Sequence, residues 1–224
     1  LEPRFYLYPA IESLVMFKNK TYLLAGSRIF FALLGFSALV TEIATLSERG
    51  KFVPANFFSY FTVESNLFAV IVLILSALEL ASDKPRDRLA LLRGSSTLNM
   101  IVVGIVFSLL LAGLDGELTA VPWDNTVLHY IMPVFVALDW FVDMAKVRIS
   151  FKRALAWMMF PITYVAYSLI RGHFVNWYPY PFLNPLESGY LGVTITCIGI
   201  ALVTAGLIWV LARFTGRDGS KNVI

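Results

Sequence analysis

Long apolar stretches alternate with short polar ones along the whole chain. Six stretches are long enough to cross a bilayer, at about residues 21–46, 57–80, 91–114, 125–144, 154–171 and 190–213. A membrane helix needs about 20 apolar residues, and helices satisfy their own backbone hydrogen bonds in lipid. Only 15% of the residues are charged, against about 25% in soluble domains. The pattern predicts an all-α integral membrane protein, in which residues 1–224 form a single domain built as a six-transmembrane-helix bundle.

The basic residues are distributed unevenly over the loops. Of the 18 Lys and Arg residues, 14 fall in the N-terminal segment, the 2–3 loop, the 4–5 loop and the C-terminal tail, and only three fall in the other loops. Because cytoplasmic loops carry the excess of Lys and Arg, we expect both termini to be cytoplasmic. The net charge of +3 comes from these short loops, so we expect no nucleic acid partner.

A polar cluster, Thr62, Glu64, Ser65 and Asn66, interrupts the second apolar stretch. Polar groups inside a membrane helix are costly unless they pair within the protein, so such a cluster is by default a candidate functional site. At 3.6 residues per turn, Thr62, Ser65 and Asn66 share one face, which we expect to point into the bundle. Glu64 lies roughly opposite Thr62 and needs a different partner.

His129 is the one histidine inside a predicted span. It lies about 6 Å into the fourth span, and Thr62 lies about 7.5 Å into the second, at 1.5 Å per residue. Both spans enter from the outer side in the predicted topology, so we expect the hydroxyl and the imidazole at matching depth. A hydroxyl beside an imidazole is the minimum for nucleophilic acyl transfer, with the histidine as base.

Helix geometry suggests the remaining parts of such a site. Asn66 and Ser65 lie within about one turn of Thr62 and are candidate donors to the developing oxyanion. Asn125 lies one turn above His129 and is a candidate to orient the imidazole through its other nitrogen. An ordinary interpretation stays open for the threonine, because a membrane-helix Thr usually bonds to the carbonyl four residues earlier.

Arg28 and Asp139 are charged residues inside the first and fourth spans. They lie at similar distances from the cytoplasmic ends of these spans, within the error of the boundaries. Since opposite charges in lipid pair with each other, we expect a structural ion pair in the inner half of the bundle, with Asn99 as a candidate third member. The alternative is a proton or ion relay, because intramembrane charges also mark transport routes.

The outer loop at residues 172–189 combines aromatic side chains with three prolines. Prolines forbid a regular helix, and aromatic side chains favour the membrane interface, so we expect a lid or rim over the outer mouth of the bundle. Its substrate-lid candidates are Trp177, Tyr178, Tyr180 and Phe182. With one cysteine, Cys197, and two histidines, the chain suits neither a disulfide nor a zinc site. We expect no metal and no cofactor.

Three motifs in this order resemble the androgen-induced-gene family, which includes the androgen-dependent regulator of tissue factor pathway inhibitor. They are Tyr-Phe-Thr-Val-Glu-Ser-Asn-Leu at residues 60–67, His129 followed by Pro133, and Trp-Tyr-Pro-Tyr-Pro-Phe-Leu at residues 177–183. The resemblance implies a six-span membrane hydrolase that cleaves fatty acid esters of hydroxy fatty acids, with Thr62 as nucleophile and His129 as the catalytic histidine. Asp139 followed by Trp140 is similar to the bacterial branch, which implies a bacterial inner membrane.

The sequence thus predicts an intramembrane threonine hydrolase. Its substrate would be a lipid ester from the bilayer, cleaved through an acyl-threonine intermediate at a site toward the outer face. One alternative is a transporter or lipid-binding membrane protein that uses Glu64, Asp139 and Arg28. Another is a structural or partner-binding membrane subunit, which predicts no cavity around Thr62.

Overall fold

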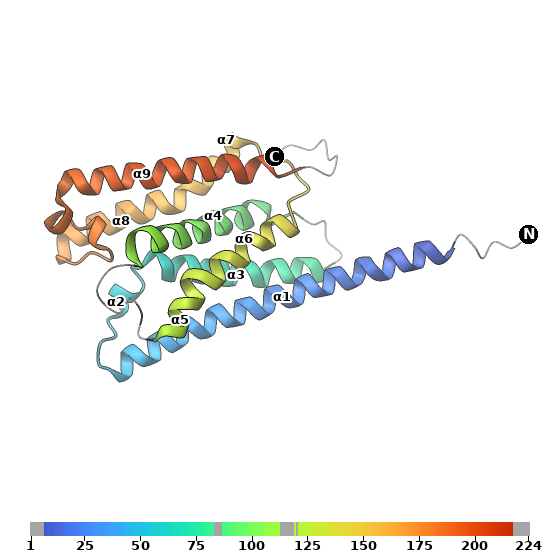
Figure 1. Ribbon diagram of the computed structural model, residues 1–224, viewed down its shortest axis with the longest axis horizontal. Coiled ribbons are helices and arrows are strands. Elements are labelled where there is room, and N and C mark those ends of the chain that lie inside the picture. Colours follow the sequence, from blue (N-terminus) through green and yellow to red (C-terminus); the bar gives the residue numbers. More distant parts are fainter. Residues whose placement is uncertain (1–6, 83–86, 113–118, 120, 217–224) are drawn as a thin grey trace, which may run out of the picture.

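The computed structural model describes the chain except for residues 1–6, 83–86, 113–118, 120 and 217–224. Six of its helical segments are long and apolar enough to cross a membrane, and Figure 1 shows them packed as one bundle. No β-strand occurs within the described ranges. The chain is therefore an all-α integral membrane protein with six spans, as the hydropathy pattern predicts.

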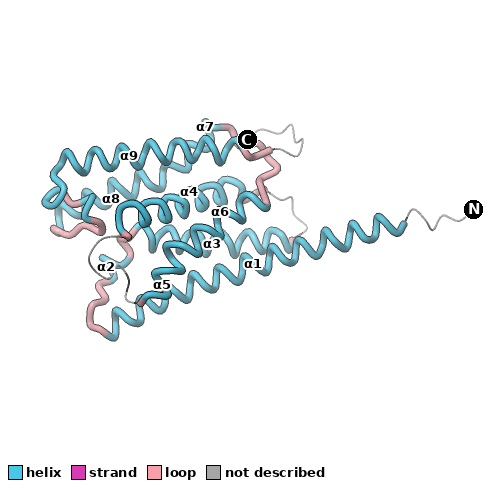
Figure 2. The backbone as a smooth tube through the Cα atoms, viewed as in Figure 1, coloured by secondary structure: helices cyan, strands magenta, loops and turns pink. Residues whose placement is uncertain are grey.

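Helices account for most of the described residues, and the loops between them gather at the two ends of the bundle (Figure 2). The helices in chain order are α1 (Leu7–Glu48), α2 (Pro54–Phe57), α3 (Phe61–Ala81), α4 (Ala90–Val106), η2 (Phe107–Leu111), α5 (Pro122–Thr126), η3 (Val127–Ile131), α6 (Met132–Val142), α7 (Phe151–Ala154), η4 (Leu155–Met158), α8 (Met159–Val175), η5 (Pro181–Leu183) and α9 (Pro185–Arg213). The spans are Asn19–Glu48, Phe61–Ala81, Ala90–Leu111, Pro122–Val142, Phe151–Val175 and Pro185–Arg213.

Three boundaries differ from the predicted ones in ways that affect the candidate site. The second span begins at Phe61, because the chain leaves the helix at residues 58–60. The fourth span begins at Pro122, in the first turn of a helix where the missing N–H of proline costs nothing. The outer loop between α8 and α9 covers only residues 176–184, so the predicted loop at 172–189 extends into both helices.

Two tyrosines of α8 hold the break before α3. Tyr164 donates its hydroxyl hydrogen to the carbonyl of Ser59 at 2.9 Å, and the Tyr167 hydroxyl lies 2.9 Å from the Ser59 hydroxyl. Ser59 Oγ also lies within hydrogen-bonding distance, 2.6 Å, of the carbonyl of Ala55 in α2. These contacts satisfy the backbone where the helix stops, which is the condition for irregular backbone within a membrane protein.

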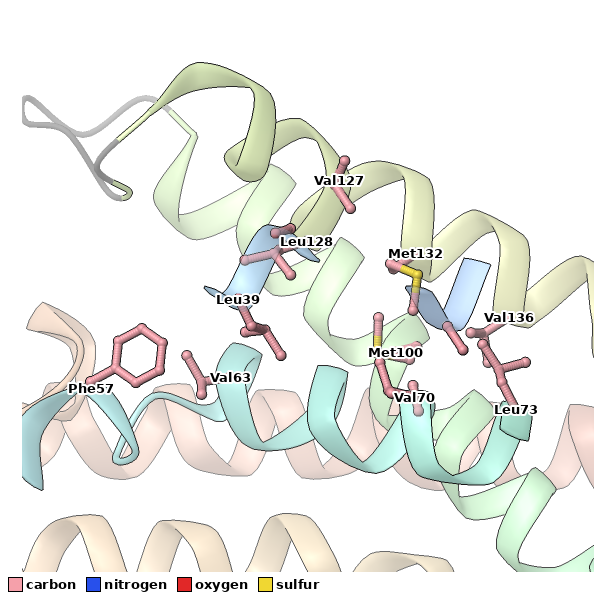
Figure 3. Close-up of a cluster of buried hydrophobic side chains, with 13 residues drawn as sticks. Leu39, Phe57, Val63, Val70, Leu73, Met100, Val127, Leu128, Met132 and Val136 are labelled. Atoms are coloured by element: carbon pink, nitrogen blue, oxygen red, sulfur yellow. The ribbon is translucent and has the colours of Figure 1, made fainter. Parts of the chain in front are cut away.

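An apolar cluster packs α1, α3, α4, η3 and α6 against each other (Figure 3). Val63 of α3 and Leu128 of η3 both belong to it, and each is the chain neighbour of a predicted catalytic residue. Close-packed side chains leave their backbone little freedom. The cluster therefore fixes the backbone on which Thr62 and His129 stand.

Candidate functional site

Thr62 stands in the first turn of α3, directly after the break. The residue before the helix, Tyr60, is extended (φ −81°, ψ 129°), and the first N–H groups of a helix have no carbonyl of a preceding turn to bond. The N–H of Thr62 donates to the Tyr180 hydroxyl at 3.3 Å, and the Thr62 hydroxyl lies 3.4 Å from the same oxygen. Within the described residues, the threonine hydroxyl makes no bond to the carbonyl of Phe58, so the ordinary interpretation of a back-bonded threonine does not hold.

His129 lies in η3, a five-residue π-helix that sequence reasoning did not anticipate. Its Nδ1 lies 3.1 Å from the carbonyl oxygen of Asn125. A carbonyl only accepts, so Nδ1 carries the hydrogen and Nε2 is left as the basic nitrogen. Phe107 of η2 stacks on the imidazole, with the ring centroids 3.9 Å apart and the planes 22° from parallel. Phe107 thus covers one face of the imidazole ring, and the carbonyl of Asn125 holds one of its nitrogens.

Thr62 and His129 line one cavity, which we call the outer cavity. Its volume is about 650 Å³, within the range of about 300–1,000 Å³ that small-ligand sites occupy. In the described part of the chain no hydrogen bond joins the two side chains. Its wall also carries charged and aromatic groups, namely Glu42, Arg49, Lys51, Tyr60 and Trp177.

A second cavity of about 420 Å³ shares Thr62 with the outer cavity as a lining residue. We call it the apolar chamber, because nearly all of its wall is hydrocarbon, from α4, η2, α8 and α9. Four residues line both cavities: Thr62, Phe107, Leu111 and Tyr180. Thr62 therefore borders both a partly polar space and an apolar one.

Two of the three candidate oxyanion or orienting residues, Asn66 and Ser65, make other contacts than the predicted ones. Asn66 Nδ2 donates to the carbonyl of Thr62 in its own helix (2.9 Å) and to that of Leu128 in η3 (3.2 Å), so both hydrogens are used and the second ties α3 to η3. Ser65 is fully buried and lines neither cavity. Asn125 contacts the imidazole at Nδ1, the nitrogen away from the proposed base, and does so through its backbone carbonyl.

The aromatic loop forms a wall of the site more than a lid. Tyr180 is 8% exposed, and its ring stacks on Phe182 at 5.2 Å. Burial raises the pKa of Tyr180 to about 12, so the hydroxyl beside Thr62 stays protonated at neutral pH. Trp177 lines the outer cavity, and Tyr178 packs against Gly172, where a β-carbon would overlap its ring.

Sequence reasoning missed Phe107, and it missed the contact that Tyr180 makes. Phe107 looks in the sequence like any other aromatic residue of an apolar span, and only its stacking on His129 gives it a place in the site. Tyr180 was identified as a lid candidate, but its contact with the Thr62 backbone and hydroxyl was not foreseen. A tyrosine among prolines in a loop is the one signal that could have indicated it.

Four charged side chains from three spans meet deep in the bundle, and we call them the inner charge cluster: Arg28, Arg93, Asp139 and Asp143. The expected pair is present, with Arg28 Nε 2.7 Å from Asp139 Oδ1. Arg93, which the prediction counted among the basic residues of the 2–3 loop, and Asp143 complete the cluster. None of the four lines the outer cavity or the apolar chamber.

Two further sequence candidates lie apart from these groups. Asn99 is fully buried but does not join the inner charge cluster, and both of its side-chain polar atoms lack a partner within the described residues. Glu64 is half-buried on α3 and lines neither cavity. Among the described residues, no three His, Cys, Asp or Glu side chains gather as they would around a metal ion.

Comparison with known proteins adds nothing to this geometry. No family model matches the chain, and neither curated proteins nor solved structures give a significant match. The resemblance of the three motifs to the androgen-induced-gene family therefore stays a prediction, and the function of the chain must be argued from the site itself.

Proposed function

We propose that the protein is an intramembrane hydrolase that cleaves a lipid ester, with Thr62 as nucleophile and His129 as general base. The observation that carries this proposal is the position of Thr62 on the walls of both cavities, with His129 on the wall of the outer one. The resemblance of the surrounding motifs to a family of membrane threonine hydrolases supports the same assignment.

The first step of the proposed reaction forms an acyl-threonine. His129 Nε2 takes the hydroxyl hydrogen of Thr62 as Oγ1 attacks the ester carbonyl, and the histidine then gives that proton to the leaving alkoxide. Water from the outer cavity hydrolyses the acyl-threonine, again with His129 as base. The two side chains are not hydrogen bonded at rest, and catalytic hydrogen bonds often tighten only when the substrate is bound.

The oxyanion of the tetrahedral intermediate needs donors, and the first turn of α3 supplies them. Backbone N–H groups at a helix start point outward and carry the positive end of the helix dipole. The Tyr180 hydroxyl lies beside the N–H and the hydroxyl of Thr62. It is therefore placed to donate a hydrogen bond to the oxyanion as well. These groups replace Asn66 and Ser65 as the proposed oxyanion donors.

The two cavities suggest the kind of ester. An acyl chain fits the apolar chamber, and the polar part of the molecule fits the outer cavity with its charged and aromatic wall. The ester carbonyl would then stand at Thr62. The basic-residue pattern and the resemblance together favour the outer face of a bacterial inner membrane as the place of the reaction.

Purified protein in detergent, assayed with fatty-acyl p-nitrophenyl esters, tests the proposal. Thr62→Ala and His129→Ala should each lower kcat by at least about 10³-fold, the scale seen when a nucleophile or its base is removed, and Thr62→Ser should retain part of the activity. Thr163→Ala, at an exposed threonine of α8, is the matched control and should hydrolyse at the parental rate.

A fluorophosphonate probe gives an independent readout. It should label the parent protein and the Thr163→Ala control but spare Thr62→Ala. Parental hydrolysis by both alanine variants at the site would exclude the mechanism.

No observation favours the transporter alternative. Arg28 and Asp139 are bound within the inner charge cluster, and Glu64 lines neither cavity.

A further inference from the structure

The apolar chamber reaches the membrane-facing surface between α8 and α9. Its wall includes Ile162 and Ala166 of α8 and Ile198 and Ala201 of α9. All four are exposed on the outside of the bundle, with Ile162 57% and Ile198 55% accessible. We call the opening between these four residues the lateral slit.

The slit lies on the side of α9 that faces α8. Near its outer end α9 packs on η5, near its inner end it packs on α7 and η4, and it also packs on α4. At the inner end Ala154 and Trp157 share an apolar cluster with Ile208 and Leu211 of α9. Within the described residues, α8 is not among the elements that pack closely on α9, although Figure 1 shows the two helices on the same flank of the bundle.

The slit lies at the depth of the acyl chains of a bilayer. Ile198 and Ala201 are near the middle of the 29-residue helix α9, whereas Thr62 is the second residue of α3 at the end of the bundle that the basic-residue pattern assigns to the outer side. A lipid of the outer leaflet has its polar end at that level and its chain running toward the bilayer centre. The chamber runs in the same direction, from Thr62 toward the residues in the middle of α9.

The apolar surroundings of the slit favour a hydrocarbon chain as its occupant. Both rims are aliphatic, and the chamber behind them is almost wholly apolar. A hydrocarbon chain that moves from the bilayer into the chamber never enters water, whereas a chain that arrived through the outer cavity would have to leave the lipid and be exposed to water, which is unfavourable in proportion to its length.

We propose that the acyl chain of a bilayer lipid enters the apolar chamber sideways through the lateral slit, so that the ester slides to Thr62 without leaving the membrane. This inference rests on the proposed function, since it names the route and the bilayer origin of the substrate.

A second lateral pocket of about 280 Å³ lies on the other flank of α9, against α4 and η2. It shares Val102, Val106, Ile200 and Thr204 with the chamber. Two of these shared residues, Val102 and Thr204, are buried, whereas all four residues of the lateral slit are exposed. We therefore assign the entry route to the slit.

Photo-crosslinking in vesicles tests the route without depending on turnover. Thr62→Ala protein is reconstituted in phosphatidylcholine vesicles with a fatty-acyl ester that carries a diazirine near the chain terminus, and labelled peptides are identified by mass spectrometry. We expect label on the buried chamber wall of α4 and η2, at Val102, Val103 and Phe107.

Closing the slit should remove that label. Ala201→Trp places an indole in the slit and should reduce the label at least fivefold, and Ala166→Trp closes it from α8 in case the first variant fails to fold. Leu202→Trp is the matched control, because Leu202 is the next residue, is 69% exposed and lies outside the chamber wall; it should leave the label unchanged. Undiminished label in both slit variants would overturn the route, as would label lost only in Gly199→Trp, which fills the second lateral pocket.

Turnover separates the route from the chemistry. In Thr62-containing protein, Ala201→Trp should slow hydrolysis of a long-chain ester in vesicles at least tenfold and leave water-soluble p-nitrophenyl acetate within about twofold, because the short ester enters by the outer cavity. Equal loss of both would contradict the route. A parent that hydrolyses neither ester but still labels the chamber in a slit-dependent way would exclude the proposed function and leave the lateral binding route standing.

Discussion

Removing the charge of Asp139 should destabilise the bundle more than removing the charge of Asp143. Asp139 is 8% exposed and accepts hydrogen bonds from Arg28 at 2.7 and 3.1 Å and from Arg93 at 3.2 Å. In Asp139→Asn the inner charge cluster keeps two guanidinium groups and one carboxylate, which leaves one buried positive charge without a partner. Breaking a buried ion pair in this way costs about 3–5 kcal/mol.

Asp143 provides the comparison within the same cluster. Its side chain is 20% exposed, so water can solvate part of the charge that remains when it is replaced. Asp143→Asn should therefore cost about 1.5–3 kcal/mol, the value of a hydrogen bond to a charged group. Both carboxylates contact both arginines. The difference in burial between the two carboxylates therefore decides which variant loses more free energy of unfolding.

Thermal unfolding in mild detergent, followed by tryptophan fluorescence, measures the difference. At about 2–4 °C per kcal/mol for a chain of this size, Asp139→Asn should lower Tm by about 6–20 °C. Glu48→Gln, at the exposed end of α1, should stay within about 0.5 kcal/mol of the parent, as surface substitutions do.

A double-mutant cycle tests whether the cluster acts as a unit. Combining Arg28→Gln with Asp139→Asn removes one charge of each sign and leaves Arg93 beside Asp143 at 3.3 Å. The loss should be smaller than the sum of the single losses by about 1–3 kcal/mol, the size of coupling between contacting groups. Additive losses, or a Tm for Asp139→Asn within 2 °C of the parent, would refute a structural role for the cluster.

Two further substitutions test the site and its packing. Tyr180→Phe removes the proposed oxyanion donor but keeps the ring, so kcat should fall about 10²-fold at nearly constant KM, whereas the exposed Tyr190→Phe should have no effect; a change in KM alone would contradict the assignment. Gly94→Ala should lower Tm, because a β-carbon there would overlap the buried Trp157 ring and overpacking costs about 1–3 kcal/mol. Gly199→Ala meets nothing within 4 Å and should be neutral or slightly stabilising; equal Tm values in both variants would argue against the packing.

The number of spans could be predicted from the sequence, because the bilayer requires apolar side chains along the whole length of each span. The start of α3 could not be predicted in this way. Residues 57–61 read Phe-Phe-Ser-Tyr-Phe, with no glycine or proline to mark a break. The break is stabilised by Tyr164 and Tyr167 from a helix a hundred residues later. A tertiary contact of this kind leaves no trace in the local pattern.

The inner charge cluster shows the same division between local and tertiary information. Arg28 and Asp139 were predicted as a pair because each is an isolated charge within an apolar span, where a partner is required. Arg93 and Asp143 lie close to the predicted ends of their spans, where charges normally face water, so their burial was not expected. Arg93 is 7% exposed and hydrogen bonds to Asp139 and to the carbonyl of Asp143.

Within the candidate site, residue types were predicted better than their roles. Asn66 was interpreted as an oxyanion donor because an amide one turn from a nucleophile has the right chemistry. The structure gives both of its hydrogens to backbone carbonyls, one of them from η3. Which of several acceptors an amide meets depends on the packing of a second helix, and helical periodicity carries no information about that.

These polar contacts explain how a membrane protein can position a hydroxyl and a base from separate helices. Lipid is as apolar as the core, so burial alone does not select one register between two spans, and hydrogen bonds between helices and close packing must do so. Asn66 fixes α3 against the carbonyl of Leu128, the residue before His129, and Tyr180 fixes the outer loop against the N–H of Thr62. Each contact ends on the backbone of a proposed catalytic residue or its neighbour, so a shift of either helix by one turn would break the contact and separate the hydroxyl from the imidazole together.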